Sequence, residues 1–180
     1  KIGVIGLGKM GSQIAQKLQE GGFEVIAHSR TKESIDAVTA FGAQGAYTKE
    51  EVISQFNGDP VVLWLMLPSG IMDVELDMWL SLVPPGGIII DGGNSDFRLT
   101  KEREKKAKAK GVNYLDSGTS GGVWGYQNGF AMMIGGDQAS FQKVEKVFQT
   151  LSLPEGAYHH FGESGAGHFV KMTHNAIEYG

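Results

Sequence analysis

The chain has 180 residues, of which 41% are hydrophobic and none is cysteine. Its 16 Lys and Arg against 20 Asp and Glu give a net charge of −4, which argues against a broad nucleic-acid-binding surface. The lack of cysteine excludes a disulfide scaffold, an iron–sulfur cluster, a thiolate zinc site and a cysteine nucleophile. No apolar run approaches the roughly 20 residues of a membrane helix. We therefore expect a soluble, cytoplasmic protein that binds neither nucleic acid nor membrane.

Apolar strands alternate with helical patterns from the first residue onward. The patterns predict strands at residues 2–5, 23–27, 61–66, 88–91, 113–116, 131–134 and 158–161. They predict helices at residues 12–20, 31–41, 72–83, 98–110 and 139–151, with further helices opening at 48 and 164. This order predicts an α/β fold of the Rossmann type, doubly wound around a mostly parallel sheet and ending in the first part of a long helix.

A glycine motif directly follows the first predicted strand and opens a helix. Glycine is abundant overall, with 27 residues and no collagen period, which suggests backbone that approaches a ligand. In a dinucleotide fingerprint the three glycines would serve a tight turn, close approach of the pyrophosphate, and helix–strand packing. The alternative is a tight turn without a ligand. The motif consists of Gly6, Leu7, Gly8, Lys9, Met10 and Gly11.

The end of the second predicted strand should contact the adenosine ribose. An Asp or Glu there is typical of NAD binding, but this chain has Ser29, Arg30 and Thr31. Because the Arg30 guanidinium can pair with a phosphate, we predict NADP, with NAD possible. The less favoured alternative is that Arg30 and Lys32 merely form the exposed start of the next helix. His28 would lie near the adenine or at the surface.

Three further segments follow predicted strands and should form loops at the cofactor crevice. Asn94, within residues 91–95, and Ser120, within residues 116–122, could donate hydrogen bonds to a substrate. Ordinary turn chemistry is the alternative for both. The remaining residues expected in these loops are Met66, Leu67 and Pro68 on the cofactor side and Gly121 and Gly122 on the substrate side.

The last predicted helix carries four polar side chains on one face. They stand at i, i+3, i+4 and i+7: Lys171, His174, Asn175 and Glu178. Lys171 and Glu178 are then roughly 10 Å apart along the axis, a distance that suits two groups acting on different carbons of a sugar. The alternative is a solvated face. A solvated face is the less favoured interpretation, because two glycines open the helix and because Asn and His are mediocre helix formers.

Residues 6–11, 91–95, 120–122 and 171–180 together resemble the N-terminal NAD(P)-binding domain of decarboxylating 6-phosphogluconate dehydrogenase, in the β-hydroxyacid dehydrogenase superfamily. The wider superfamily shares the glycine motif and the spacing from Lys171 to Asn175. His174 and residues 177–180 favour the 6-phosphogluconate branch. Residues 123–129 resemble the shorter members of that branch, some of which prefer NAD.

The resemblance implies oxidative decarboxylation of 6-phosphogluconate to ribulose 5-phosphate with NADP, a step of gluconate utilization and the pentose phosphate pathway. Lys171 would act as general base and then as general acid, and Glu178 would protonate the enediol. No metal would be needed. The substrate would be held by Asn94, which also borders the cofactor, and by Ser120, Gly121, Gly122, His174, Asn175 and Tyr179.

The resemblance also implies the domain organisation. Residues 1–163 would form the dinucleotide-binding domain, and residues 164–180 would begin a helix leading into an all-helical C-terminal domain that this chain lacks. That domain would complete the phosphate site and form a homo-oligomer, a dimer or larger. The isolated domain should bind cofactor but turn over poorly. Two rival functions stay open: a dehydrogenase of 3-hydroxyisobutyrate or a related small β-hydroxyacid, and a non-catalytic NADP-binding module.

Overall fold

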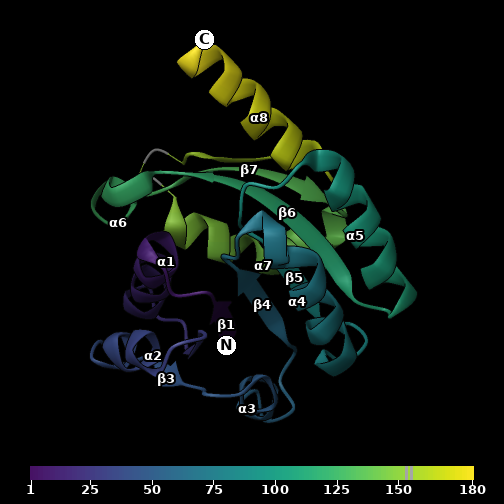
Figure 1. Cartoon of the computed structure of the whole chain (residues 1–180). Helices are drawn as coiled ribbons and strands as arrows, with labels where there is room; N and C mark the ends of the chain where they lie inside the picture. Colours follow the sequence, from purple (N-terminus) through teal and green to yellow (C-terminus); the bar gives the residue numbers. More distant parts are fainter. Residues whose placement is uncertain (153, 155) are drawn as a thin grey trace.

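The computed structural model describes residues 1–152, 154 and 156–180, and it contains one eight-stranded sheet (Figure 1). The strand order is β3-β2-β1-β4-β5-β6-β7-β8, and every neighbouring pair is parallel except β6 and β7. This order confirms the predicted doubly wound α/β fold. The strands are β1 (Ile2–Ile5), β2 (Val25–His28), β3 (Gln44–Gly45), β4 (Val62–Leu65), β5 (Ile88–Asp91), β6 (Asn113–Ser120), β7 (Ala131–Gly136) and β8 (Tyr158–Gly162).

Helices cover both faces of the sheet and enclose two hydrophobic cores. One core lies under α1, α2 and α7, and the other under α3, α4 and α5. Successive side chains of β4 alternate between them, because Trp64 enters the first core and Leu63 and Leu65 enter the second. The helices are α1 (Lys9–Glu20), α2 (Lys32–Thr39), α3 (Lys49–Ser54), α4 (Ser69–Leu82), α5 (Phe97–Ala109), α6 (Gly125–Asn128), α7 (Gln138–Leu151) and α8 (Ala166–Tyr179).

Local sequence signals explain where several helices begin. The Thr48 side chain accepts a hydrogen bond from the backbone N–H of Glu51, as the predicted capping box requires. Asp96 and Asp137 cap α5 and α7 by accepting hydrogen bonds from backbone N–H groups. The first helix differs, since Gly8 stands at its N-cap without a side-chain hydrogen bond. Its first-turn N–H groups are therefore left for another partner.

The prediction of a loop over residues 116–122 is wrong in its first part. Strand β6 continues to Ser120 because β7 pairs with it antiparallel, from Leu115 opposite Gly136 to Ser120 opposite Ala131. A short 3-10 helix, Gly122–Trp124, and then α6 follow. The two-residue strand β3 was not predicted either, since it is too short to show a period in the sequence.

Glycines bring α8 against the sheet, and its second half projects away from the body (Figure 1). A Cβ at Gly118 of β6 would overlap the Lys171 side chain, and a Cβ at Gly167 would overlap the Met133 carbonyl oxygen of β7. The absence of these Cβ atoms lets the backbones of the helix and the strands approach closely. Among the described residues, no helix combines the length and the apolar character needed to cross a membrane.

Candidate cofactor and active site

The predicted glycine motif forms the turn between β1 and α1, and each glycine has a different environment. Gly6 has φ +90°, and a Cβ there would overlap the Met66 carbonyl oxygen. A Cβ at Gly11 would overlap the Gly6 carbonyl oxygen. Gly8 is exposed, and a Cβ added there would have no heavy atom within 4 Å. Contacts within the protein therefore explain why glycine stands at positions 6 and 11. The open space at Gly8 leaves room for a ligand against the backbone.

A cavity of about 230 Å³ extends from this turn between the end of β2 and the start of α4. The hydroxyl of Ser29 accepts a hydrogen bond from the backbone N–H of Leu7 at 3.5 Å, which connects the β2 end to the glycine turn. The cavity and the uncapped helix start fit a dinucleotide. Eight of the predicted cofactor residues line this cavity: Gly6, Leu7, Gly8, Ser29, Arg30, Met66, Leu67 and Pro68.

Other predicted cofactor residues lie around the turn without lining the cavity. Lys9 is exposed, Met10 packs against the core, and Gly11 is buried at the turn. The Thr31 hydroxyl lies 2.7 Å from that of Ser34 at the start of α2. His28, left open by the sequence, lines the cavity, and its Nδ1 lies 2.9 Å from the Ala46 carbonyl oxygen.

Sequence reasoning missed Lys49, Ile71 and Glu75, which also line this cavity. Lys49 belongs to the predicted capping box, and that signal concerns only the start of a helix. No sequence signal relates it to Glu75, because the two residues come from different helices.

A second cavity, of about 290 Å³, brings together three residues that were predicted from two separate motifs. Asn94 comes from the loop after β5, and Lys171 and Asn175 come from one face of α8. Loop and helix meet here because α8 packs against β6, the neighbour of β5. Ser95, Asp96, His168 and Met172 complete the lining.

Lys171 is almost fully buried, with 6% of its surface exposed. Burial lowers the pKa of its amine, and the Glu178 carboxylate works in the opposite direction. A lowered pKa increases the fraction of neutral amine near pH 7, and only a neutral amine can accept a proton. The environment of Lys171 thus suits a general base.

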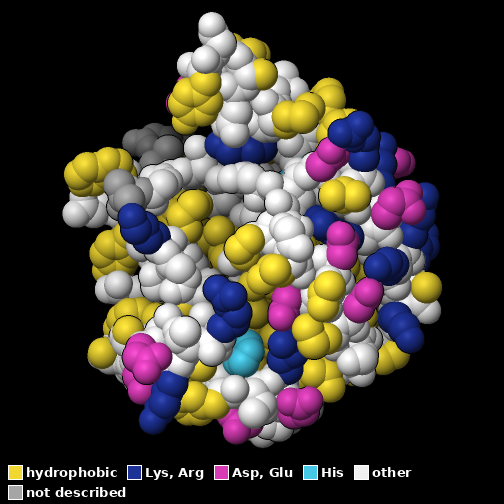
Figure 2. Space-filling model, viewed as in Figure 1, with side chains coloured by type: hydrophobic (Ala, Val, Ile, Leu, Met, Phe, Trp, Pro, Cys, Tyr) yellow, Lys and Arg dark blue, Asp and Glu magenta, His cyan; other side chains and the backbone are white. Residues whose placement is uncertain are grey.

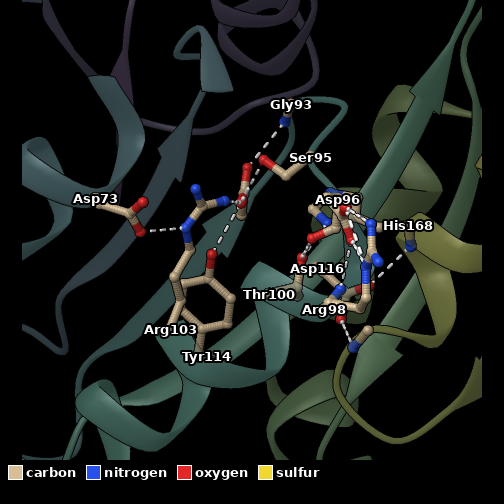
Figure 3. Close-up of polar contacts among 12 residues, drawn as sticks. Asp73, Gly93, Ser95, Asp96, Arg98, Thr100, Arg103, Tyr114, Asp116 and His168 are labelled. Carbon is tan, nitrogen blue, oxygen red and sulfur yellow. Dashed lines mark hydrogen bonds and ion pairs between the residues drawn. The ribbon is translucent and has the colours of Figure 1, made fainter. Parts of the chain in front are cut away.

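Asp116 of β6 holds the start of the helix that carries Lys171. Its carboxylate accepts hydrogen bonds from the backbone N–H groups of Gly165 at 2.8 Å and His168 at 2.9 Å. His168 is fixed in addition by Thr100 of α5, with 2.7 Å between Nδ1 and the hydroxyl oxygen (Figure 3). Burial raises the pKa of Asp116, and the nearby His168 works against this shift. These contacts fix the helix one turn before Lys171.

A buried polar cluster supports the loop that carries Asn94. The Asp91 carboxylate accepts hydrogen bonds from the Gly93 backbone N–H at 3.2 Å and the Tyr114 hydroxyl at 2.8 Å. The Arg103 guanidinium lies 3.6 Å from Asp91 and donates to Asp73 at 2.8 Å, so it connects α5 to α4 (Figure 3). Burial, followed by the Asp91 carboxylate, holds the pKa of Tyr114 well above its usual value.

The remaining predicted substrate residues do not line the second cavity, and neither does the predicted catalytic residue Glu178. Ser120 ends β6, and Gly121 and Gly122 follow it. His174 and Glu178 form an exposed pair on α8, with 3.4 Å between Nδ1 and Oε2. Tyr179 is 81% exposed near the end of the projecting helix. Among the residues that the structure describes, no group of three or more His, Asp or Glu side chains is arranged to hold a metal ion.

Comparison with known proteins relates the chain to one family of enzymes. The NAD binding domain of 6-phosphogluconate dehydrogenase, as a family, matches residues 1–160. A Haloferax volcanii protein named NAD(+)-dependent, decarboxylating 6-phosphogluconate dehydrogenase is 37% identical over 180 residues, covering 99% of this chain and 59% of that protein. The chain therefore spans less than two thirds of this relative.

Solved structures agree on the fold. Plasmodium falciparum 6-phosphogluconate dehydrogenase, whose structures include complexes with NADP+ and with 6-phosphogluconate, has a TM-score of 0.89 and 30% identity, covering 99% of this chain and 40% of that one. Mycobacterium tuberculosis 3-hydroxyisobutyrate dehydrogenase also has a TM-score of 0.89, at 24% identity, covering 98% of this chain and 59% of that one. At that identity the second likeness shows a shared fold only.

Proposed function

Because this chain belongs to the family of NAD-binding domains of 6-phosphogluconate dehydrogenase, we propose that the full-length protein oxidises and decarboxylates 6-phosphogluconate to ribulose 5-phosphate with NADP. The supporting observation is the cavity that brings the buried Lys171 together with Asn94 and Asn175. An amine with a lowered pKa and two amides is a set of groups suited to a polyhydroxy acid.

Lys171 acts twice in the proposed reaction. Its neutral amine removes the proton of the substrate 3-hydroxyl while the hydrogen on the same carbon leaves as hydride, for which the nicotinamide is the acceptor when bound. The bond to the carboxylate carbon then breaks, carbon dioxide leaves, and the electron pair passes toward the 3-keto oxygen. Lys171 returns the proton to this oxygen, which gives an enediol. Glu178 then protonates the first carbon and completes ribulose 5-phosphate.

The other predicted substrate residues act in binding. Asn94 and Asn175 hydrogen-bond the hydroxyl or carboxylate groups of the substrate from inside the cavity. We propose that Ser120, Gly121, Gly122 and His174 extend this contact and that Tyr179 reaches the phosphate. Tyr179 and Glu178 are exposed on the projecting half of α8. We therefore propose that other parts of the full-length protein surround these two side chains and complete the substrate site.

The first test is a coupled assay of the full-length protein with 6-phosphogluconate. Reduced nicotinamide is followed by absorbance and carbon dioxide is measured in parallel, separately with NADP and NAD. We expect the two products in equal amounts and faster with NADP. Absence of both signals would contradict the proposal and favour a small β-hydroxyacid substrate.

We propose that Arg30 binds the 2′-phosphate, since this residue lines the cofactor cavity at the end of β2 and a guanidinium pairs well with phosphate. Arg30→Asp should weaken NADP binding by roughly ten- to a hundredfold, as loss of hydrogen bonds between charged groups predicts, and should leave NAD binding nearly unchanged. Lys32→Asp makes the same charge change outside the cavity lining and serves as the control. Equal effects of Arg30→Asp on the two cofactors would refute this role.

Two rival functions are separated by single substitutions in the full-length protein. A 3-hydroxyisobutyrate dehydrogenase needs no enediol protonation, so full activity of Glu178→Gln with 6-phosphogluconate would count against our proposal. A non-catalytic NADP-binding module needs no base. That module is excluded if Lys171→Ala abolishes turnover while the dissociation constant of NADP is unchanged.

A further inference from the structure

The β6–β7 loop, residues 121–130, begins with two of the proposed substrate residues and has little regular structure of its own. Gly121 and Gly122 have φ +150° and +49°, a region that other residues rarely adopt. The short 3-10 helix and the four-residue α6 follow them. A helix as short as α6 is not stable by itself. The conformation of the loop therefore depends on contacts with neighbouring elements.

One residue of this loop, Tyr126 in α6, directs three polar groups to the cofactor-side helix α1. Its hydroxyl donates to the two carboxylate oxygens of Glu20, at 2.7 and 2.9 Å. Its backbone N–H donates to the Gln13 side-chain oxygen at 3.1 Å, and its carbonyl accepts from the Lys17 ammonium at 3.3 Å. The Gln16 amide donates both to the Tyr126 hydroxyl and to Glu20. The four partners stand at i, i+3, i+4 and i+7, on one face of α1.

These contacts lie at the surface, where Figure 2 shows hydrophobic and basic side chains over α1 and α6. The hydrogen bond from Tyr126, followed by that from Gln16, lowers the pKa of Glu20, and the Glu20 carboxylate raises the pKa of Tyr126. The acceptor thus stays ionised and the donor stays protonated around neutral pH. Because exposed polar pairs add little to the free energy of unfolding, stability of the fold is a weak explanation for this group of contacts.

Close packing connects Tyr126 to the substrate end of the loop. Gly125, the residue before Tyr126, and Gly121 both lie against the ring of Phe130, which a Cβ at either glycine would overlap. The Phe130 ring is fully buried, so it cannot yield easily. A displacement of α6 would therefore also displace Gly121. At its other end, α1 begins at Gly8, beside the cofactor cavity.

We propose that Tyr126 is a positioning residue, which holds the β6–β7 loop on α1 and so sets the distance between the substrate residues 120–122 and the cofactor. Tyr126 acts through the loop and does not itself touch the substrate. The identity of that substrate, 6-phosphogluconate, rests on the proposed function. Loss of the Tyr126 hydroxyl should weaken substrate binding and leave cofactor binding nearly unchanged.

The test is Tyr126→Phe in the full-length protein, with two measurements. Hydrogen exchange followed by mass spectrometry should show the amides of residues 121–129 exchanging roughly fivefold faster, as loss of one hydrogen bond predicts. The KM for 6-phosphogluconate should rise by a similar factor with a smaller change in kcat, and the dissociation constant of NADP from calorimetry should stay the same. Unchanged exchange in the loop, or faster exchange with an unchanged KM, would overturn the proposal.

Variants of the partner residue separate positioning from a general structural effect. Glu20→Gln keeps an acceptor for the Tyr126 hydroxyl and should retain the KM and the exchange rates. Glu20→Leu removes the acceptor, so it should reproduce Tyr126→Phe and replaces that variant if it does not fold. Equal effects of Glu20→Gln and Glu20→Leu would contradict the proposed hydrogen bond.

Tyr47→Phe is the matched control, since the Tyr47 hydroxyl donates to the Asp36 carboxylate at 2.6 Å, outside the loop and α1. This variant should leave both the loop exchange and the KM for 6-phosphogluconate unchanged. If the unaltered protein does not turn over 6-phosphogluconate, the proposed function fails. The exchange measurement then decides by itself whether Tyr126 holds the loop on α1.

Discussion

At the scale of single residues, burial rather than a neighbouring cation prepares Lys171 for proton transfer. The side chain lies over Gly118, where any Cβ would overlap it, and only 6% of the residue is exposed. Desolvation penalises the charged ammonium, whereas Glu178 stabilises it. Since the pKa is lowered overall, the cost of burial exceeds the attraction of the exposed carboxylate.

The lowered pKa of Lys171 predicts the pH dependence of both activity and stability. In the full-length protein, kcat/KM should rise with pH and level off below pH 10.5, the ordinary pKa of lysine. Between the lowered pKa and 10.5 the unfolded chain binds more protons than the folded one, so the free energy of unfolding should rise with pH there. Steady-state kinetics and urea titrations at several pH values measure the two effects.

Lys171→Met supplies the control for this prediction. Methionine fills a similar volume without a titrating group, so the rise in the free energy of unfolding over that pH range should become smaller. An activity limb centred at or above pH 10.5 would show that the environment of Lys171 does not favour the neutral amine in solution.

At the scale of elements, the β1–α1 turn separates the folding role of glycine from its binding role. A Cβ at Gly11 would overlap the Gly6 carbonyl oxygen, whereas the position of a Cβ at Gly8 is open. Helix α1 starts at this open position without a side-chain cap. The same short motif therefore contains positions required by the fold and a position available to the ligand.

Substitution of each glycine by alanine should resolve these roles. Gly8→Ala should fold with little change in Tm but bind NADP at least tenfold more weakly, because the methyl group occupies the space next to the backbone N–H groups. Gly11→Ala should lose about 1–3 kcal/mol of stability through overpacking. Thermal unfolding and calorimetric titration distinguish the two. Equal losses of stability in both variants would contradict this division.

At the scale of the whole molecule, the cluster around Asp91 connects the sheet to two helices. Arg103 of α5 reaches Asp73 of α4 and Asp91 at the end of β5, and Tyr114 of β6 donates to the same Asp91 carboxylate. Asp91 and Arg103 are both about 1% exposed. The position of the loop after β5, which brings Asn94 to the second cavity, therefore depends on contacts from several elements.

Removal of the cation from this cluster should destabilise the whole molecule. Arg103→Met leaves the buried Asp91 without its positive neighbour, for which losses of 3–5 kcal/mol are typical. We expect about 3 kcal/mol, the lower end of that range, because Tyr114 and Gly93 still donate to the carboxylate. Arg98→Met, which breaks the exposed pair with Asp96, should barely change stability. Similar small effects of both substitutions in urea unfolding would contradict a structural role for the cluster.

The sequence by itself determined the features that depend on local spacing. The alternation of strand and helix patterns predicts the doubly wound sheet, and the glycine motif predicts the β1–α1 turn. Helical periodicity places Lys171 and Asn175 on one face, and both line the second cavity. Each of these features arises within one turn of helix or one strand–helix unit, so the order of residues is sufficient to predict it.

The tertiary structure alone decided which distant residues meet. The extension of β6 to Ser120 depends on antiparallel pairing with β7, and the capping of α8 joins Asp116 to His168, 52 residues further along the chain. The burial of Lys171 and the pairing of Lys49 with Glu75 likewise require separate elements to pack together. A local pattern does not encode these contacts, because packing and desolvation depend on every element that surrounds a side chain.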